Sequence, residues 1–289
     1  MKFPELTYAA DNDPAFKRFL IQSIERLAGR DYFVPIYETW RRDYIGKDVP
    51  FIRPVLDLLG SELQISSGSW PAKIDADAPL IIVANHPFGI MDGLGALALA
   101  EDLGRPFRVL IHKDLMKVPE IRPCSLPIDF SETREAQRIN LATRKKALQL
   151  LGKGETIVVF PAGGVATAPT TFGRAVELPW KLFTARMVQM AKAQVLPVYF
   201  EGQCSPLFHF ISKFSPTLRI SMLISEFRRH AGKPLKAHIG PIIPYDALQA
   251  QGDRKALMDF LFARVHAMAD LPLEAMQEHA EHLPDWLKS

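Results

Sequence analysis

The stretch LIIVANHPFGIMDGLGALALA, residues 80–100, decides the fold. Its first five residues, 80–84, are all apolar, which is typical of a strand that is buried on both faces. The strand ends at Asn85-His86-Pro87, and a helical stretch opens at Asp92. A buried strand followed by a turn and a helix predicts one crossover unit of a parallel sheet.

The same alternation of strand and helix continues along the chain. Further strands are predicted at 107–112, 156–160, 195–200 and 235–239, and helices at 92–103, 133–151, 176–193 and 217–230. Strands that alternate with helices pair in parallel through crossovers. We therefore predict an α/β fold with a mostly parallel sheet that is flanked by helices.

Helical segments precede and follow this core. Residues 1–60 are the predicted N-terminal helical segment, with two or three helices that end at Gly60. Residues 61–289 are the predicted α/β domain, which helices at 253–270 and 273–283 close.

The helix expected at 14–30 has an apolar face and basic neighbours. Phe16, Phe19, Leu20, Ile24 and Leu27 fall at helical spacing on that face. Such a helix can lie on a membrane surface, and packing on the protein's own core is the alternative.

His86 and Asp92 predict a catalytic pair at the turn after the first strand. Asp92 would hold one ring nitrogen of His86 and leave the other free to take a proton from a hydroxyl or an amine. This is the chemistry of acyl transfer. A histidine near an aspartate is also common in structural turns, where Pro87 and Gly89 would be ordinary turn residues.

The motif NHPFGIMDG, residues 85–93, resembles the glycerophospholipid and lysophospholipid acyltransferase superfamily, whose members carry an Asn-His pair followed by an Asp. Five residues separate His86 from Asp92, one more than in the broad superfamily. This spacing and the form NHPxGxxDG make the hemolysin-like and ornithine-lipid acyltransferase branch the closer resemblance.

Later segments resemble further blocks of the same superfamily, at 111–130, 155–167 and 195–210. The third block commonly reads FPEGT, whereas this chain reads FPAGG, with Ala162 in place of the Glu. That Glu is assigned a part in holding the acceptor's phosphate region. Its absence argues for an acceptor other than glycerol phosphate.

The resemblance implies an acyltransferase that moves a fatty acyl group to a hydroxyl or amine of a lyso-lipid. The acyl donor would be acyl carrier protein or acyl-coenzyme A, and His86 would be the general base. A direct transfer is expected, because the chain has no Gly-x-Ser-x-Gly elbow for a covalent acyl-enzyme. No metal or redox cofactor is implied.

Motifs after the predicted strands provide candidate substrate contacts, since functional residues of such sheets gather at strand carboxyl ends. A glycine turn can present N–H groups to an oxyanion, and basic side chains, Arg134 among them, can bind an anionic head group. The candidate substrate-binding residues are Asn85, Lys113, Arg122, Pro161, Gly163, Gly164 and Arg174.

Three other functions stay open. A hydrolase would use His86 and Asp92 to activate water on a lipid ester or thioester. A non-catalytic lipid- or carrier-binding protein would keep only the fold. A metal site at His86, Asp92 and His112 is the third alternative.

Composition limits the partners and the compartment. A net charge of +3 is too small to indicate nucleic-acid binding, and it fits an anionic membrane surface or an acidic carrier protein. Cys124 and Cys204 are the only cysteines, which indicates free thiols in a reducing compartment. No stretch predicts a transmembrane helix or a signal peptide. We expect a cytoplasmic protein that is peripheral on the inner face of the cell membrane.

Overall fold

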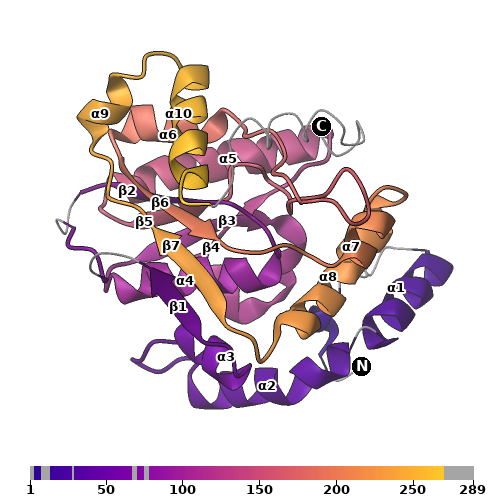
Figure 1. Ribbon diagram of the computed structural model, residues 1–289. Helices are drawn as coiled ribbons and strands as arrows, with labels where there is room; N and C mark the ends of the chain where they lie inside the picture. Colours follow the sequence, from indigo (N-terminus) through magenta and orange to yellow (C-terminus); the bar gives the residue numbers. More distant parts are fainter. Residues whose placement is uncertain (1–2, 8–13, 28, 67–69, 75–77, 270–289) are drawn as a thin grey trace.

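A seven-stranded sheet forms the centre of the computed structural model, which describes residues 3–7, 14–27, 29–66, 70–74 and 78–269 (Figure 1). The strands are β1 Leu63–Ser66, β2 Leu80–Ala84, β3 Phe107–His112, β4 Ser125–Ile128, β5 Thr156–Val159, β6 Gln194–Phe200 and β7 Leu235–Ile239. Their order is β1-β7-β6-β2-β5-β3-β4. The β6–β7 pair is antiparallel and the other described neighbours are parallel. The predicted α/β fold is therefore confirmed.

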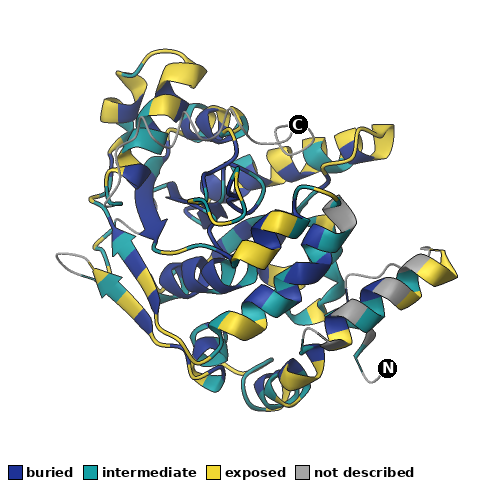
Figure 2. Ribbon diagram, turned by 45° about the vertical axis from the view of Figure 1, so that its right-hand side comes forward, coloured by how far each residue is buried: buried dark blue, intermediate teal, exposed yellow. Residues whose placement is uncertain are grey.

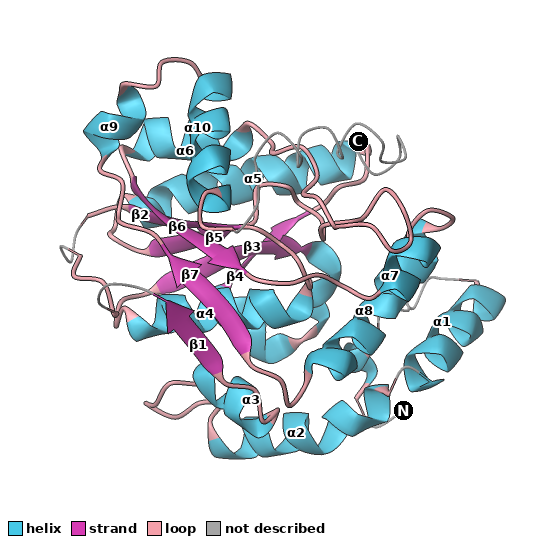
Figure 3. Cartoon of the chain, in the orientation of Figure 1, coloured by secondary structure: helices cyan, strands magenta, loops and turns pink. Residues whose placement is uncertain are grey.

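Helices cover both faces of this sheet (Figure 3). Side chains of α2, α3, α4 and α8 pack on one face, and those of α5, α6, α9 and α10 pack on the other. The helices are α1 Ala15–Leu27, α2 Arg30–Asp43, α3 Arg53–Leu58, α4 Ile90–Asp102, α5 Arg134–Leu151, α6 Phe183–Ala191, α7 Pro206–Ile211, α8 Pro216–His230, α9 Tyr245–Gln249 and α10 Arg254–His266. Among the described residues, short 3-10 helices are η1 Pro4–Leu6, η2 Lys113–Lys117 and η3 Pro119–Cys124.

The central strand β2 joins the two layers. All five of its residues are completely buried (Figure 2). Ile81 and Val83 pack towards α5, whereas Leu80, Ile82 and Ala84 pack towards α4. Burial of each large aliphatic side chain is worth about 1.5–3 kcal/mol. The strand is thus a firm support for the turn that follows it.

Several elements differ from the sequence prediction. The four-residue strands β1 and β4 were not predicted, because both are short and lie at the edges of the sheet. The helix expected at 176–193 begins only at Phe183. Val176 instead forms an antiparallel bridge with Thr167, and Pro179 disfavours helix in the residue before it. The helix expected at 273–283 lies outside the described residues.

The N-terminal helices pack on the rest of the molecule through α8 and α4. Helix α1 contacts α8, and α3 contacts α4. On α1, Ile21 and Glu25 are buried, but Phe16 is 77% exposed and Phe19 is 68% exposed. Within the described ranges, no helix is long and apolar enough to cross a bilayer.

Candidate active site

The carboxyl ends of four strands meet at one edge of the sheet, because β2, β3, β5 and β6 run parallel. His86 follows β2, Lys113 follows β3, Pro161 follows β5 and Glu201 follows β6. Segments that are far apart in the sequence can therefore build one site at this edge.

His86 and Asp92 form a pair at this edge. Nδ1 of His86 lies 2.8 Å from Oδ2 of Asp92, a completely buried residue in the first turn of α4. The chain turns into α4 at Gly89, whose φ of 86° suits glycine. An Nδ1–H donated to Asp92 leaves Nε2 as the proton acceptor. No described residue hydrogen-bonds Nε2, and 17% of the side chain is exposed.

The charges around His86 set its basicity. Burial by itself lowers the pKa of His86, but the nearby carboxylates of Asp92 and Glu177 outweigh burial and raise it. The guanidinium of Arg219 acts in the opposite direction. His86 is therefore a stronger base than a free histidine, and it must lose its proton before it can act as one.

Asn85 is engaged with the neighbouring strand. Its Nδ2 donates to the carbonyl of Phe200 at 2.9 Å, and its Oδ1 accepts the N–H of Phe200 at 2.6 Å. These bonds extend the β2–β6 pairing by one residue and fix the start of the turn. The amide of Asn85 is therefore paired with the main chain of Phe200 at the start of the turn that carries His86.

The loop between β5 and α6, residues 160–182, holds the main chain of His86 from both sides. The carbonyl of His86 accepts the N–H of Ala166 at 2.8 Å. The N–H of His86 donates to Oε1 of Glu177 at 2.8 Å. The ring of Phe160 lies against the imidazole, with 4.3 Å between ring centroids. The loop therefore fixes the catalytic candidate through hydrogen bonds and packing.

Glu177 is a second buried carboxylate beside His86. Its Oε2 accepts the indole N–H of Trp180 at 3.0 Å. Burial raises the pKa of Glu177 to about 7, although the N–H groups of His86 and Trp180 oppose the rise. Ala162 packs against the two neighbours of Glu177, Val176 and Leu178. Position 162 thus has no carboxylate, and Glu177, which lies between the two residues that pack on Ala162, places one beside His86.

Arg219 of α8 anchors the same loop. Its side chain is buried and donates to Oγ1 of Thr167 at 2.6 Å and to the carbonyl of Val165. The guanidinium lies 4.8 Å from the ring centroid of Phe208. Burial lowers the pKa of Arg219 to about 10. Arg219 therefore ties the loop to α8 at Val165 and Thr167, the two neighbours of Ala166, whose N–H bonds to His86.

The glycine turn offers one backbone donor. Gly163 has a φ of 71°, and its N–H closes the turn on the carbonyl of Phe160 at 3.0 Å. Of the two successive N–H groups expected to be free, only that of Gly164 has no partner among the described residues. A side chain at Gly164 would approach Leu178 to 2.8 Å. Pro161 is buried in the same turn.

The predicted cationic residues do not converge on His86. Nζ of Lys113 pairs with Asp129 at 2.7 Å. Arg122 precedes the amino end of β4, and its Nε donates to the carbonyl of Met116 at 2.6 Å. Arg122 therefore contacts η2, the segment that follows β3, and no described contact joins it to His86.

Arg174 and Arg134 are both exposed at the edge where the parallel strands end, and Arg134 begins α5. Arg174 belongs to a hollow at the end of β6, which is lined by Phe172, Gly173, Arg174, Ala175, Tyr199, Gly202 and Gln203. Gly202 packs closely on Phe88, two residues after His86. Among the predicted cationic residues, Arg174 is therefore exposed in a hollow next to the turn that carries His86.

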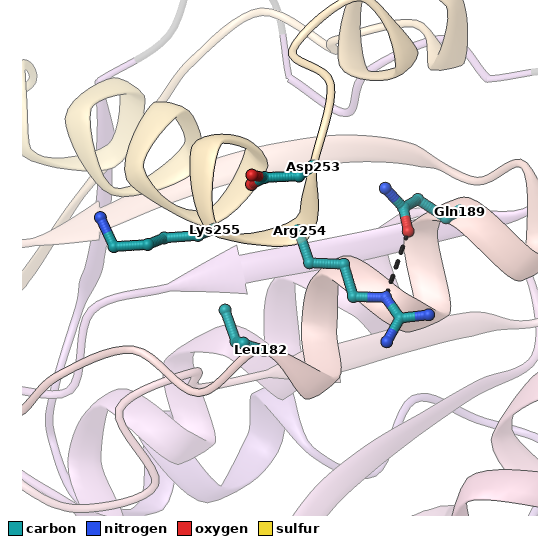
Figure 4. Close-up of a pocket in the computed structure, with 5 residues that line it drawn as sticks. All are labelled: Leu182, Gln189, Asp253, Arg254 and Lys255. Atoms are coloured by element: carbon teal, nitrogen blue, oxygen red, sulfur yellow. Dashed lines mark hydrogen bonds between the residues drawn. The ribbon is translucent and has the colours of Figure 1, made fainter.

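The structure also bears on a metal site at His86 and on a second hollow away from His86 and Asp92. In the described part of the chain, no group of three His, Cys, Asp or Glu side chains could hold a metal ion, so His112 does not complete a site with His86 and Asp92. A separate hollow between α6 and α10 is lined by Leu182, Gln189, Asp253, Arg254 and Lys255 (Figure 4). It contains none of the residues that contact His86.

Sequence reasoning missed Glu177 and Arg219. Glu177 lay inside a predicted helix, where its side chain would have been read as a surface charge. Pro179, two residues later, was the signal that the helix starts further on. Arg219 carried no comparable signal, because one arginine on a helix does not reveal which loop it contacts.

Comparison with known proteins identifies the class. The sequence profile of a family described as Acyltransferase matches residues 51–270. The lyso-glycine lipid O-acyltransferase of Phocaeicola vulgatus is 23% identical over 241 residues, which cover 79% of this chain and 80% of that protein. The protein of the same description from Bacteroides thetaiotaomicron is 23% identical over 247 residues, which cover 79% of this chain and 82% of its own.

Among solved structures, the chain resembles the 1-acyl-sn-glycerophosphate (LPA) acyltransferase PlsC of Thermotoga maritima. The TM-score is 0.48 and the identity 17%, with 89% of this chain and 90% of that chain covered. The family match spans most of the chain. The protein therefore belongs to the acyltransferase family, as its sequence resemblance predicted, and it is an acyltransferase.

Proposed function

We propose that this acyltransferase moves a fatty acyl group from a thioester donor to the hydroxyl of a lyso-lipid, with His86 as general base and Asp92 as its orienting partner. The observation that carries the proposal is the 2.8 Å contact between Nδ1 of His86 and the buried Asp92, which leaves Nε2 unpartnered among the described residues. The family match and the two relatives named O-acyltransferases support it.

The reaction needs only groups that this edge of the sheet provides. Nε2 of His86 takes the proton of the acceptor hydroxyl as its oxygen attacks the thioester carbonyl carbon. The tetrahedral oxyanion can accept the N–H of Gly164. The carbon–sulfur bond then breaks, and the departing thiolate takes the proton from His86, so the base is restored.

The acceptor is proposed to be a lyso-lipid whose head group differs from glycerol phosphate. Ala162 leaves the third sequence block without its usual carboxylate, and the relatives are named for lyso-glycine lipid. Arg174 is the proposed contact for an anionic head group, because it is exposed in the hollow beside the turn. A hydroxyl acceptor is favoured over an amine by the names of the relatives.

The donor is proposed to be acyl carrier protein, with acyl-coenzyme A as the alternative. An acidic carrier would be attracted by the exposed basic triplet Arg144-Lys145-Lys146 on α5. Arg228 and Arg229 are exposed as well. Arg228 lies 3.7 Å from the ring centroid of Tyr32, as Arg144 lies 5.0 Å from that of Phe183, and Arg229 lies 3.7 Å from Oε2 of Glu226. We also propose that the enzyme works on the inner face of the cell membrane, where it would meet a lipid acceptor.

The test incubates the protein with labelled acyl carrier protein or acyl-coenzyme A and a panel of lyso-lipids, and resolves the products by mass. His86→Ala is the inactive variant. His112→Ala is the matched control, because His112 is the last residue of β3 and its Nδ1 accepts the N–H of Asp114 at 3.2 Å.

A diacyl lipid formed by the wild type and by His112→Ala, but not by His86→Ala, and only with acceptor present, is the expected result. Release of fatty acid without any acceptor would assign the protein to the hydrolases. Lipid binding without turnover of any donor and acceptor pair would make it a binding protein.

A further inference from the structure

Four large apolar side chains are exposed on neighbouring segments, and we call Phe172, Leu207, Phe210 and Phe214 the apolar rim. Phe172 is 89% exposed and Phe214 is 69% exposed. Single exposed apolar residues are ordinary on protein surfaces, but a cluster of them marks a site of interaction. Phe210 and Phe214 already contact each other, with 5.0 Å between ring centroids.

Hydrogen bonds hold the segments of the rim together. The side chain of Gln203, just before α7, accepts the N–H of Ala175 at 2.8 Å and donates to the carbonyl of Gly173 at 3.2 Å. Nδ1 of His209, on α7, accepts the N–H of Ala168 at 3.2 Å. The loop that carries Phe172 and the helix that carries Leu207 and Phe210 are therefore one continuous surface.

The apolar rim lies beside the proposed active site. Cys204, which precedes α7, contacts the carbonyl of Pro87 at 3.4 Å, and Ala166 bonds to the carbonyl of His86. Phe172 also forms part of the hollow that contains Arg174. A molecule bound at the rim is thus next to the turn that carries His86.

The charge of these segments has one sign. Residues 165–176 and 202–222 contain no Asp or Glu, and Arg174 and Lys213 lie within them, whereas Arg219 is buried. Helix α8 contacts both α7 and α1, whose Phe16 and Phe19 are exposed, and these helices lie on one side of the molecule (Figure 1). Exposed aromatic residues among basic residues match the interface of an anionic bilayer.

We propose that the apolar rim, next to α1, is the surface with which this protein lies on an anionic membrane, so that a lyso-lipid reaches His86 from the bilayer without crossing water. The proposal rests on a lipid acceptor as argued above. It adds that the contact is made at the mouth of the site and not by the N-terminal helix alone.

The test is co-sedimentation of the full-length protein with vesicles of phosphatidylglycerol and phosphatidylcholine, and with vesicles of phosphatidylcholine alone. The rim variant carries Phe210→Ser and Phe214→Ser, which lie outside the hollow of Arg174, and a second variant carries Phe16→Ser and Phe19→Ser on α1. Met190→Ser is the matched control, because Met190 is 57% exposed on α6, which packs over the far layer of the sheet.

The rim variant is expected to bind the anionic vesicles at least about tenfold more weakly than the wild type, with Met190→Ser unchanged. Its turnover of a lyso-lipid in vesicles is expected to fall by a similar factor, while turnover of a short-chain, water-soluble lyso-lipid stays the same. If the rim variant binds vesicles more weakly but the wild type turns over neither acceptor, the membrane surface would be supported and the proposed function would be excluded.

Wild-type sedimentation by the rim variant would overturn the proposal, and so would a loss confined to the α1 variant. The same holds if the wild type does not bind vesicles at all. A change of oligomeric state in the rim variant, with unchanged vesicle binding, would assign the apolar rim to a second copy of the chain.

Discussion

The turn after β2 contains His86, whereas the loop between β5 and α6 contacts His86 from a distant part of the chain. The turn, residues 85–89, places His86 and Asp92 by local geometry, within one strand-to-helix connection. The loop, residues 160–182, reaches His86 through Glu177 and Ala166, which lie 91 and 80 positions away in the chain (177 − 86 and 166 − 86).

This contrast separates chemistry from positioning. In the proposed mechanism, His86 of the turn moves the proton and Asp92 of α4 orients it, whereas the loop fixes the main chain of His86 and adds the charge of Glu177 to its surroundings. We therefore expect substitutions in the turn to abolish turnover, and substitutions in the loop to shift rates, pH dependence and stability. Each of the following changes tests that division.

His86→Gln is expected to have the largest effect. Glutamine keeps a polar side chain but has no basic nitrogen, so kcat should fall by roughly 10²–10⁴-fold, the usual contribution of a general base. Circular dichroism and thermal unfolding should match the wild type. A residual rate within tenfold of the wild type would show that the proton goes elsewhere.

Asp92→Asn should lower kcat strongly but less than loss of the base. The amide keeps the size of the buried carboxylate and removes the charge that raises the pKa of His86. We expect a loss of roughly 10²-fold or more and an acid limb of the pH–rate profile that moves to lower pH. An unchanged acid limb would mean that Asp92 does not set the basicity of His86.

Arg219→Met tests the loop through its anchor. The change removes the buried donor to Oγ1 of Thr167 and one of the two donors to the carbonyl of Val165, which still accepts the hydroxyl of Thr167. We expect a cost of about 1–3 kcal/mol of stability. We expect a lower Tm and a fall of roughly tenfold in kcat/KM, about 1.4 kcal/mol. Arg219→Lys, which keeps the charge, should fall between the two, and equal activity of all three proteins would exclude a role for the anchor.

Glu177→Gln should change activity only a few-fold, but it should alter the pH dependence of kcat/KM and the pH dependence of stability. The acid limb of kcat/KM should move to lower pH, since the Glu177 carboxylate helps to raise the pKa of His86. A merely structural role would leave that limb in place. Glu177→Ala, which also removes the acceptor for the His86 N–H, should lower kcat further.

The same variant has a signed effect on stability. The folded-state pKa of Glu177, about 7, is above its usual value of 4.5, so folding favours the protonated form. The stability that the protonated carboxyl provides is complete below pH 4.5 and is lost as pH rises through about 7. Thermal unfolding should therefore improve for Glu177→Gln relative to the wild type between pH 5 and pH 8. The reverse trend would place Glu177 in a more polar environment.

The smallest effect is expected from Arg122→Ala. Arg122 is exposed and bonds to the carbonyl of Met116, and no described contact joins it to His86. Activity should therefore stay within about twofold and stability within about 0.5 kcal/mol. Arg174→Ala is the matched comparison, and it should raise KM for an anionic acceptor. Equal effects of the two variants would remove Arg174 from the proposed head-group contact.

The parallel sheet and the His–Asp turn could be predicted because both are local. An apolar run such as 80–84 predicts a buried strand wherever it lies in the fold, and the five residues between His86 and Asp92 limit how far apart the two can lie. The glycine turn at Gly163 was predicted for the same reason.

The sequence by itself thus determined the class of fold, the acyltransferase resemblance and the identity of the proposed base. Tertiary structure decided which distant residues act on that base, because Glu177 and Arg219 reach the turn only through loop docking that no sequence period records. It also decided that Arg122 contacts Met116 and not His86, since the 3-10 helices η2 and η3 lead into the unpredicted strand β4. Short strands and single charged side chains carry little local signal, and their positions follow from packing.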